Sequence, residues 1–313
     1  MDSSIDQPFV ADDRLTAWHQ PYNFARRILF RYTNVAERRR RFTMQSRRTD
    51  ADNKEEFVSS LARGLAVIRA FGPDRPQMTL TEVASATGLS PAVARRFLLT
   101  LVRLRYAAHD GKHFMLRPSI LELGAGYLSS VNIAQIAQPQ LQTLRDNVGD
   151  ATSLAVLDGD DIIQVCYVPA RRLYRFTVTN GTREAAYTSA AGRAMLAHLD
   201  AHAIDEFLSR VRLEARTDRT ETSPTKFRAV LADVREHGYA VVVDEFEYGI
   251  TSIAVPIFDG TTVIAAAACV ASSGYLTEDE LVSTRLPELR NATERIAEEL
   301  ARFPAFAQSV RWA

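Results

Sequence analysis

The chain has 313 residues, of which 46% are hydrophobic and 24% are charged, and its basic and acidic residues balance to a net charge of zero. Its length allows about two or three domains, and none of its apolar runs reaches the roughly 18 to 20 residues that a membrane helix needs. The N-terminus lacks a signal-peptide pattern and the 2 cysteines form no C-x-x-C motif, so we expect a soluble, cytoplasmic protein that needs no disulfide.

The charge is distributed unevenly along the chain. Residues 1–54 hold 11 Lys and Arg against 7 Asp and Glu, residues 55–118 hold 9 against 5, and residues 119–313 hold 18 against 26. The first two segments therefore carry +4 each and the last carries −8. A cationic N-terminal part and an acidic remainder are expected when only one end of a protein meets a polyanion.

Residues 1–54 contain an arginine cluster, Arg38 to Arg41 followed by Arg47 and Arg48, among polar residues. This composition predicts a flexible basic arm. Two interpretations stay open for it. The arm either makes nonspecific contacts with phosphates, or it is a solvated tail or a stretch upstream of the true start.

Two helices are predicted in the first part of 55–118. In the first, over 57–71, Leu61 and Leu65 share one apolar face with Ile68 and Phe71, and a Gly-Pro pair ends the run. The second is short, runs over 79–88, and has a Thr cap at its start and a glycine at its end.

A third helix and a hairpin complete this segment. The helix begins with proline, whose missing N–H costs nothing there, and its apolar sector is expected to hold Val93, Phe97, Leu101 and Leu104. An Asp-Gly turn between extended runs predicts a β-hairpin over 106–116. A hairpin directly after a cationic helix is typical of a winged helix-turn-helix.

The outer face of the third helix is the candidate DNA-binding surface. The second helix of a helix-turn-helix enters the major groove, and neighbouring cations hold phosphates. The candidate contacts are Ser90, Ala92, Arg95, Arg96 and Thr100 in the helix and its cap, and Lys112 and His113 in the hairpin. The alternative is a three-helix module that binds protein, against which the +4 charge and the hairpin argue.

After a predicted linker helix over 119–132, the segment 133–313 alternates helices and strands. Helices are expected at 133–148, 190–199, 201–212, 224–237 and 277–302, and strands at 151–158, 161–168, 174–179, 239–244, 252–258 and 262–270. Asp-Gly turns between neighbouring strands predict hairpins. The expected fold class is therefore α+β, with an antiparallel sheet flanked by helices.

A seat for a carboxylate is predicted at Thr188-Ser-Ala-Ala-Gly192, where a helix opens after a strand. Free backbone N–H groups and the helix dipole attract anions to such a terminus, and small residues let a ligand approach. For Thr188 and Ser189, ordinary helix capping is the alternative.

Patterns of catalysis and cofactor binding are absent from the sequence. His198 and His202 have a metal-ligand spacing, but the chain has no H-E-x-x-H motif and no evident third ligand. There is also no phosphate-binding loop, dinucleotide fingerprint or nucleophile elbow. We therefore expect no catalytic residue, metal or cofactor; the alternatives are an enzyme acting on the bound acid and a ligand-independent assembly module.

Longer motifs resemble the IclR family of regulators, and the resemblance runs from about Phe57 to Ala301. The motifs are Leu80-Thr-Glu-Val-Ala84, Thr87-Gly-Leu-Ser90, Ala94-Arg-Arg-Phe-Leu-Leu-Thr-Leu101, Asn180-Gly-Thr-Arg183, Thr188-Ser-Ala-Ala-Gly-Arg193 and Gly249-Ile-Thr-Ser-Ile-Ala-Val-Pro256. They are most similar to the branch that contains PcaR, PcaU and PobR, which governs aromatic-acid breakdown.

The resemblance implies a winged helix-turn-helix, a linker helix and a GAF-like effector domain. It implies a transcriptional regulator that forms dimers or dimers of dimers on a double-stranded DNA operator. Its effector would be a small carboxylate, either an aromatic acid or an intermediate of aromatic breakdown. The implied effector-site residues are Thr188, Ser189, Ala190, Ala191, Asp244, Ser252, Cys269 and Ala271.

The chain departs from the family pattern at several positions. Pro91 replaces a usual basic residue, so one DNA contact is expected to be missing. The stretch from Asp244 to Gly249 is one residue shorter than usual, which leaves open whether Asp244 or Glu245 faces the pocket. Glu184 replaces an apolar residue, which is expected to change the pocket mouth. For Cys269, a plain core position is the alternative.

Overall fold

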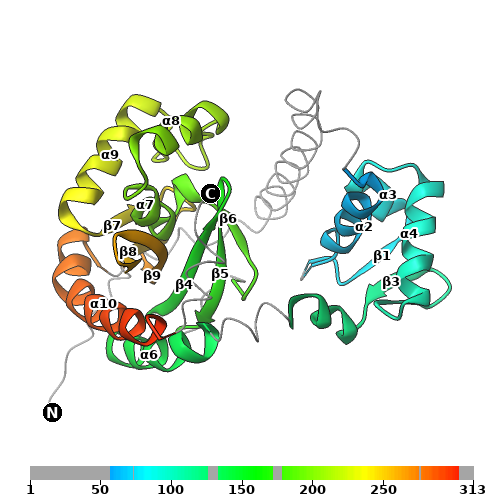
Figure 1. Ribbon diagram of the computed structural model, residues 1–313, viewed down its shortest axis with the longest axis horizontal. Coiled ribbons are helices and arrows are strands. Elements are labelled where there is room, and N and C mark those ends of the chain that lie inside the picture. The colour runs from blue at the N-terminus through cyan, green and yellow to red at the C-terminus, as the bar shows by residue number, and fades with distance from the viewer. Residues whose placement is uncertain (1–56, 73, 126–132, 172–177, 275, 303–313) are drawn as a thin grey trace, which may run out of the picture. The chain divides into compact units, whose positions relative to one another are not determined.

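The structure, a computed structural model, describes residues 57–72, 74–125, 133–171, 178–274 and 276–302 (Figure 1). The chain divides into two compact units, Met1–Leu123 and Gly124–Ala313, and the division falls within the expected linker. Residues 122–125 are helical, as expected there. The basic arm, residues 126–132 of the linker and most of the strand expected at 174–179 lie outside the described residues.

The N-terminal unit is the expected winged helix-turn-helix. Its described elements are α2 (Ser59–Arg69), β1 (Gln77–Thr79), α3 (Leu80–Thr87), α4 (Pro91–Arg103), β2 (Ala107–His109), β3 (His113–Leu116) and the 3-10 helix η2 (Pro118–Leu121). The strands form an antiparallel sheet in the order β1-β3-β2. The sequence did not predict β1, because a strand of 3 residues is too short to show alternation.

The caps that bound α3 and α4 are those expected from the sequence. Thr79 and Glu82 form a reciprocal capping box, and Gly88 ends α3 with a left-handed φ of 68°. Ser90 then caps α4, whose first turn contains Pro91. Since α3 and α4 are each fixed by local hydrogen bonds, the sequence alone determines the turn between them.

Burial in the N-terminal unit differs from the expected pattern in two helices. The buried residues of α4 are Ala94, Leu98 and Leu101, while Leu104 is 59% exposed. In α2 the buried residue is Val67, whereas Leu61 and Leu65 are 64% and 40% exposed. In the apolar face expected in 57–71, Leu61 and Leu65 are therefore open, whereas Ile68 and Phe71 pack against the core.

The C-terminal unit contains an antiparallel sheet in the order β6-β5-β4-β9-β8-β7. Its strands are β4 (Ala151–Asp158), β5 (Asp161–Val168), β6 (Arg183–Ala185), β7 (Ala240–Val243), β8 (Ile250–Asp259) and β9 (Thr262–Ser272). Its helices are α6 (Ile133–Val148), η3 (Ala186–Thr188), α7 (Ala190–Leu196), α8 (Ala201–Arg210), α9 (Pro224–His237) and α10 (Glu278–Leu300). This confirms the expected α+β class with a GAF-like, curled sheet.

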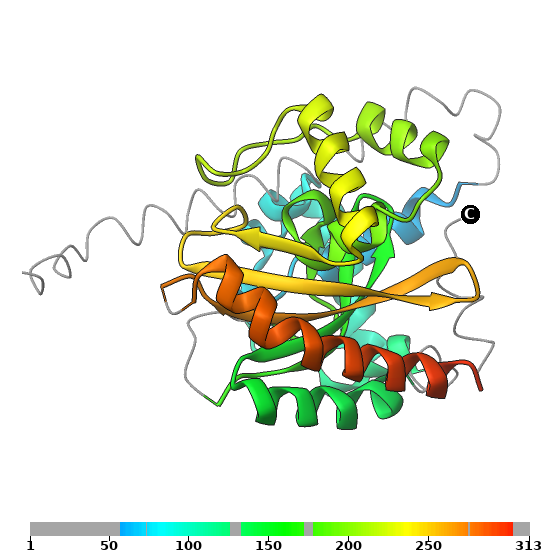
Figure 2. The same ribbon diagram turned by 90° about the vertical axis from the view of Figure 1, so that its left-hand side faces the viewer.

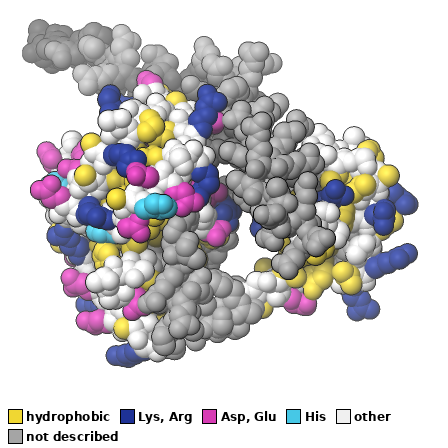
Figure 3. All heavy atoms as spheres, turned by 45° about the horizontal axis from the view of Figure 1, so that its top comes forward, with side chains coloured by type: hydrophobic (Ala, Val, Ile, Leu, Met, Phe, Trp, Pro, Cys, Tyr) yellow, Lys and Arg dark blue, Asp and Glu magenta, His cyan; other side chains and the backbone are white. Residues whose placement is uncertain are grey.

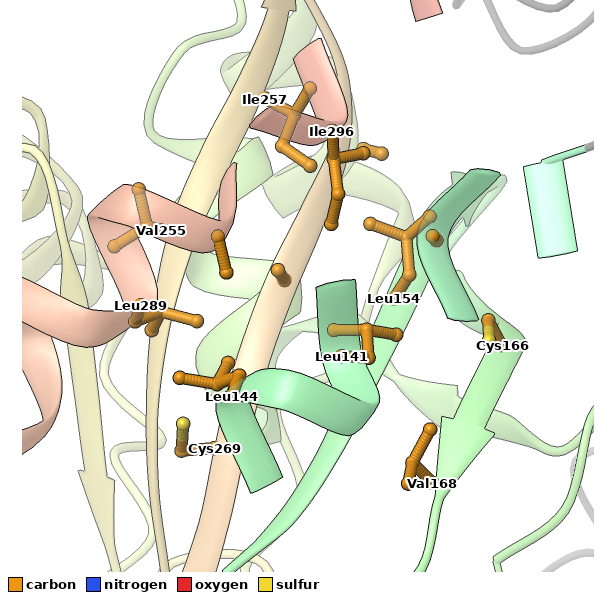
Figure 4. Packing of buried hydrophobic residues seen from close by; sticks show 14 of the residues in the cluster. Leu141, Leu144, Leu154, Cys166, Val168, Val255, Ile257, Cys269, Leu289 and Ile296 are labelled. Atoms are coloured by element: carbon orange, nitrogen blue, oxygen red, sulfur yellow. The ribbon is translucent and has the colours of Figure 1, made fainter. Parts of the chain in front are cut away.

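Helices cover both faces of this sheet (Figure 2). On one face, α6 and α10 pack over large side chains such as Leu154, Val255 and Ile257 (Figure 4). On the other face, α7 packs across the central strands, and α9 packs against α7. The strand residues beneath α7 are small; they include Ala155, Ala254, Ala266 and Ala268. Alanines at these positions allow the helix to lie close to the sheet.

Candidate DNA-binding surface and effector site

The DNA-binding candidates in α4 share its outer face. Ala92, Arg95, Arg96 and Thr100 are all exposed, as is the capping residue Ser90. Two of the hydroxyls have local roles: Ser90 accepts from the N–H of Val93 at 3.4 Å, and Thr100 donates to the carbonyl of Arg96 at 2.8 Å. Arg95 and Arg96 are therefore the side chains best suited to reach a nucleic acid. Figure 3 shows Lys and Arg side chains on this unit, at the right of the view, with few acidic ones.

The β2–β3 hairpin forms the wing. Its turn is held by Asp110, which accepts from the N–H groups of His113 at 2.7 Å and Lys112 at 2.8 Å. These hydrogen bonds lower the pKa of Asp110 to about 2. Lys112 is exposed at the tip, whereas His113 is half-buried with Nδ1 3.4 Å from Asp110. Lys112 is thus the wing cation that can meet a phosphate.

In the C-terminal unit, the segment 188–191 that was predicted as a carboxylate seat is buried at the start of α7. Thr188, Ser189, Ala190 and Ala191 are 0%, 9%, 1% and 2% exposed. Thr188 donates to the carbonyl of Ala185 at 3.0 Å, and Ser189 accepts from the N–H of Gly192 at 3.5 Å. Ser189 therefore caps α7, which was the alternative interpretation for it, whereas Thr188 bonds back to the preceding turn and caps no helix.

Gly192 is required for α7 to pack where it does. A Cβ atom at this position would lie 2.1 Å from the carbonyl oxygen of Ala186, which is backbone and cannot move aside. Only glycine allows the first turn of α7 to pass so close to η3. The glycine of the Ala-Ala-Gly sequence is thus explained by close packing of backbone on backbone.

A buried ion pair anchors the same helix, and the sequence did not predict it. Arg193 is 2% exposed; it donates to the carbonyl of Tyr187 at 2.8 Å and to both carboxylate oxygens of Glu245 at 2.6 and 2.5 Å. Its guanidinium also lies over the ring of Phe227, 5.5 Å from the centroid. A single arginine in an apolar helix was the available signal, but its partner lies 52 residues away.

The two neighbouring carboxylates between β7 and β8, Asp244 and Glu245, have different partners. Glu245 points to Arg193, so it is already neutralised. Asp244 has a positive φ of 57°, and its carboxylate accepts from the N–H of Gly249 at 2.7 Å and from Ser273 at 2.8 Å. Asp244 therefore closes its own turn.

The stretch between α8 and α9 forms hydrogen bonds near both members of the ion pair, to Tyr187 beside Arg193 and to the backbone at Glu245. The hydroxyl of Tyr187 donates to the carbonyl of Glu214 at 2.9 Å and accepts from its N–H at 3.0 Å. Thr217 and Thr220 donate to the carbonyls of Asp244 and Glu245, each at 2.7 Å. Residues from η3, α7, the 214–220 stretch and the β7–β8 turn thus form one network.

The structure separates the predicted sheet residues of the effector site. Ser252 pairs with Val242, which faces α7, so Ser252 lies on the same face as segment 188–191. Cys269 and Ala271 belong to the core on the opposite face, beneath α6 and α10 (Figure 4). Their assignment to this site is corrected: side chains alternate along a strand, so Ala268 and Val270 are the β9 residues that face α7.

The two cysteines of the C-terminal unit are buried, and the predicted histidine pair is not brought together around a metal. Burial raises the pKa of the Cys269 thiol far above its usual value and that of Cys166 to about 11. The ring of His198 packs edge-on against Phe258, 4.9 Å between centroids, whereas His202 is exposed. Among the described residues, no cluster of His, Cys, Asp or Glu could hold a metal, and no helix has the length and apolarity to span a membrane.

A winged helix-turn-helix joined to an antiparallel-sheet domain of this kind defines the class: a DNA-binding regulator with a separate sensor domain. The family description "Bacterial transcriptional regulator IclR C-terminal" matches residues 125–298, and "IclR helix-turn-helix domain" matches residues 60–111. The chain belongs to the IclR family of transcriptional regulators, and its named relatives are regulators rather than enzymes.

Named relatives fall in the branch expected from the motifs. The Pca regulon regulatory protein of Pseudomonas putida is 39% identical over 78% of this chain and 85% of its own length. The p-hydroxybenzoate hydroxylase transcriptional activator of Acinetobacter baylyi is 32% identical over 77% and 92%. An IclR homologue of Microbacterium hydrocarbonoxydans, solved with 4-hydroxybenzoate, is 25% identical, with a TM-score of 0.68 over 78% of this chain and 100% of that one.

Proposed function

We propose that this regulator changes its operator binding when a small aromatic carboxylate binds between the first turn of α7 and the sheet. The observation that carries the proposal is the buried first turn: no described residue accepts a hydrogen bond from the N–H of Ala190 or Ala191, which are 1% and 2% exposed. A carboxylate would satisfy these donors. The 4-hydroxybenzoate bound by the Microbacterium homologue supports an aromatic acid.

Ser252 would face this ligand from the sheet, together with Ala268 and Val270 in place of Cys269 and Ala271. The pair of Arg193 and Glu245 would hold the first turn of α7 in position without binding the acid. The seat is therefore electrically neutral apart from its backbone donors, and it suits a single small anion.

The regulator is proposed to act in the cytoplasm as a homodimer or a dimer of dimers on repeated half-sites. An open apolar surface at the start of α2 supports self-association: Phe57 and Val58, which precede the helix, and Leu61 within it are 69%, 61% and 64% exposed. A second copy would remove this surface from water. Leu61→Glu should shift the sedimentation coefficient toward a smaller species, while Lys226→Glu, an exposed change in the C-terminal unit, should leave it unchanged.

The ligand proposal is tested by titrating 4-hydroxybenzoate into the wild type and Ala191→Leu by calorimetry, with operator gel shifts alongside. An isobutyl group would fill the seat, so we expect affinity for the acid to fall by about 100-fold, the loss of two charge-assisted hydrogen bonds, with DNA binding retained. Undiminished affinity in a folded variant would place the ligand elsewhere. Turnover of the acid would indicate an enzyme, and absence of any binding would indicate a ligand-independent module.

A further inference from the structure

Gln164 on β5 has a buried acceptor without a partner. The residue is 5% exposed, its Oε1 atom is buried, and no described residue donates a hydrogen bond to it. Buried side-chain polar atoms in native proteins nearly always have a partner, so an orphaned acceptor indicates a group that binds there.

The strand pairing places Gln164 on the face of the sheet that α7 covers. Gln164 is opposite Ala155 on β4, and directly opposite residues of antiparallel strands share a face. Ala155 packs with the residues of α7, as does Ile162, two positions before Gln164 on β5. The β4–β5 register shifts between Leu154 and Ala155, directly after Gln164 on β5. Because of this bulge, Val165 and Cys166 both face the core beneath α6 and α10.

Glu184 on β6 determines which atom of the Gln164 amide lacks a hydrogen-bond partner. The Nε2 of Gln164 donates to Oε1 of Glu184 at 3.3 Å. A flipped amide would place its oxygen against the carboxylate, and two acceptors repel each other. The orphaned atom must therefore be the oxygen, so the missing partner is a hydrogen-bond donor.

We propose that Gln164 determines effector specificity by accepting a hydrogen bond from a hydroxyl group on the effector. This inference rests on the proposed function above. It narrows the effector to hydroxylated aromatic acids, with the carboxylate at the first turn of α7 and the hydroxyl toward β5. The orientation also keeps the anionic end of the acid away from Glu184.

The backbone of Gln164 is held independently of its side chain. Its N–H donates to the carbonyl of Thr182 at 2.9 Å, and its carbonyl accepts from Gly181 at 2.7 Å. Replacing the amide by leucine keeps these backbone bonds and removes both the Oε1 acceptor and the Nε2 donor to Glu184. Glu184→Gln is a second variant; it leaves Gln164 in place but lets its amide present either end.

The test is calorimetric titration of the full-length protein with benzoate, 3-hydroxybenzoate and 4-hydroxybenzoate. We expect the wild type to bind at least one hydroxybenzoate about tenfold more tightly than benzoate, the equivalent of one neutral hydrogen bond. Gln164→Leu should lose this preference by weakening only the hydroxy acid. Glu184→Gln should reduce the ratio of hydroxybenzoate affinity to benzoate affinity, while the affinity for benzoate itself stays constant.

The outcomes separate this inference from the proposed function. If the wild type binds benzoate and both hydroxybenzoates equally, or if Gln164→Leu keeps the preference, the proposed role of Gln164 is wrong. The proposal of an aromatic effector is unaffected by that result. If none of the acids binds the wild type, both proposals fail. Circular dichroism and operator gel shifts check the fold of each variant, and the isosteric change in Glu184→Gln tests the inference even if Gln164→Leu does not fold.

Discussion

Arg96 is exposed on the outer face of α4 and lies outside the core of the N-terminal unit. We expect Arg96→Ala to weaken specific operator binding by about 10- to 100-fold, since a good arginine contact contributes roughly 1 to 3 kcal/mol. Gel shifts at one salt concentration measure the change. The matched control Arg212→Ala removes an exposed arginine from the C-terminal unit and should have no effect. Equal loss in both variants would contradict the role of α4.

Gly192 gives the sharpest stability prediction for a single residue. In Gly192→Ala, the new Cβ would lie 2.1 Å from backbone of Ala186, so α7 must move away from η3. We expect the free energy of unfolding in urea to fall by about 1 to 3 kcal/mol, as in overpacked cores. Gly274→Ala is the control, because nothing lies within 4 Å of its added Cβ. A fully stable Gly192→Ala protein would show that the two backbones are not so close.

At the scale of elements, the ion pair between α7 and the β7–β8 turn links segments far apart in sequence. Glu245→Ala would leave Arg193, 2% exposed, without its carboxylate, and we expect a loss of about 3 to 5 kcal/mol in unfolding free energy. The control is Arg210→Ala, which breaks solvent-exposed pairs with Asp160 and Glu206 and should cost less than about 1 kcal/mol. Similar losses from the two variants would show that the buried pair is dispensable.

The sequence predicted the longer elements closely, because each is bounded by caps and turns that act locally. The helix at 224–237 and the strands at 151–158 and 161–168 have the expected bounds. It missed β1 and β6, each of 3 residues, because so short a run shows no periodicity. It also grouped Leu61 and Leu65 with Ile68 and Phe71 on one apolar face, but only Ile68 and Phe71 pack against the core, because apolar spacing does not tell which part of a face is covered.

The candidate site was predicted in part for similar reasons. The helix start at 188–192 follows from local sequence, and the structure buries it as a seat would require. Of the strand residues that the resemblance implied, Ser252 lies on the α7 face, whereas Cys269 and Ala271 lie on the other face. Arg193 with Glu245 and Gln164 with Glu184 depend on tertiary contacts, which no local pattern specifies.

At the scale of the whole molecule, residues 1–54 are proposed to add sequence-independent affinity for DNA. Their deletion should weaken operator binding mainly at low salt and reduce the slope of log affinity against log salt by roughly 0.9 for each phosphate that the arm neutralises. Fluorescence anisotropy over a salt series measures this slope. A variant with Arg38 to Arg41 changed to glutamine should reproduce much of the effect. An unchanged slope in the truncated protein would mean that the arm is a bystander.

The alanines beneath α7 also constrain how such a regulator can evolve toward new signals. Ala155, Ala254, Ala266 and Ala268 are at most 4% exposed, so a larger side chain at any of them would take up space used by α7 or by a ligand bound beneath its first turn. We therefore expect these four positions to tolerate little increase in side-chain size. Chemical diversity among effectors is expected to come from the rim, at edge positions such as Glu184, where substitutions leave the packing of α7 intact.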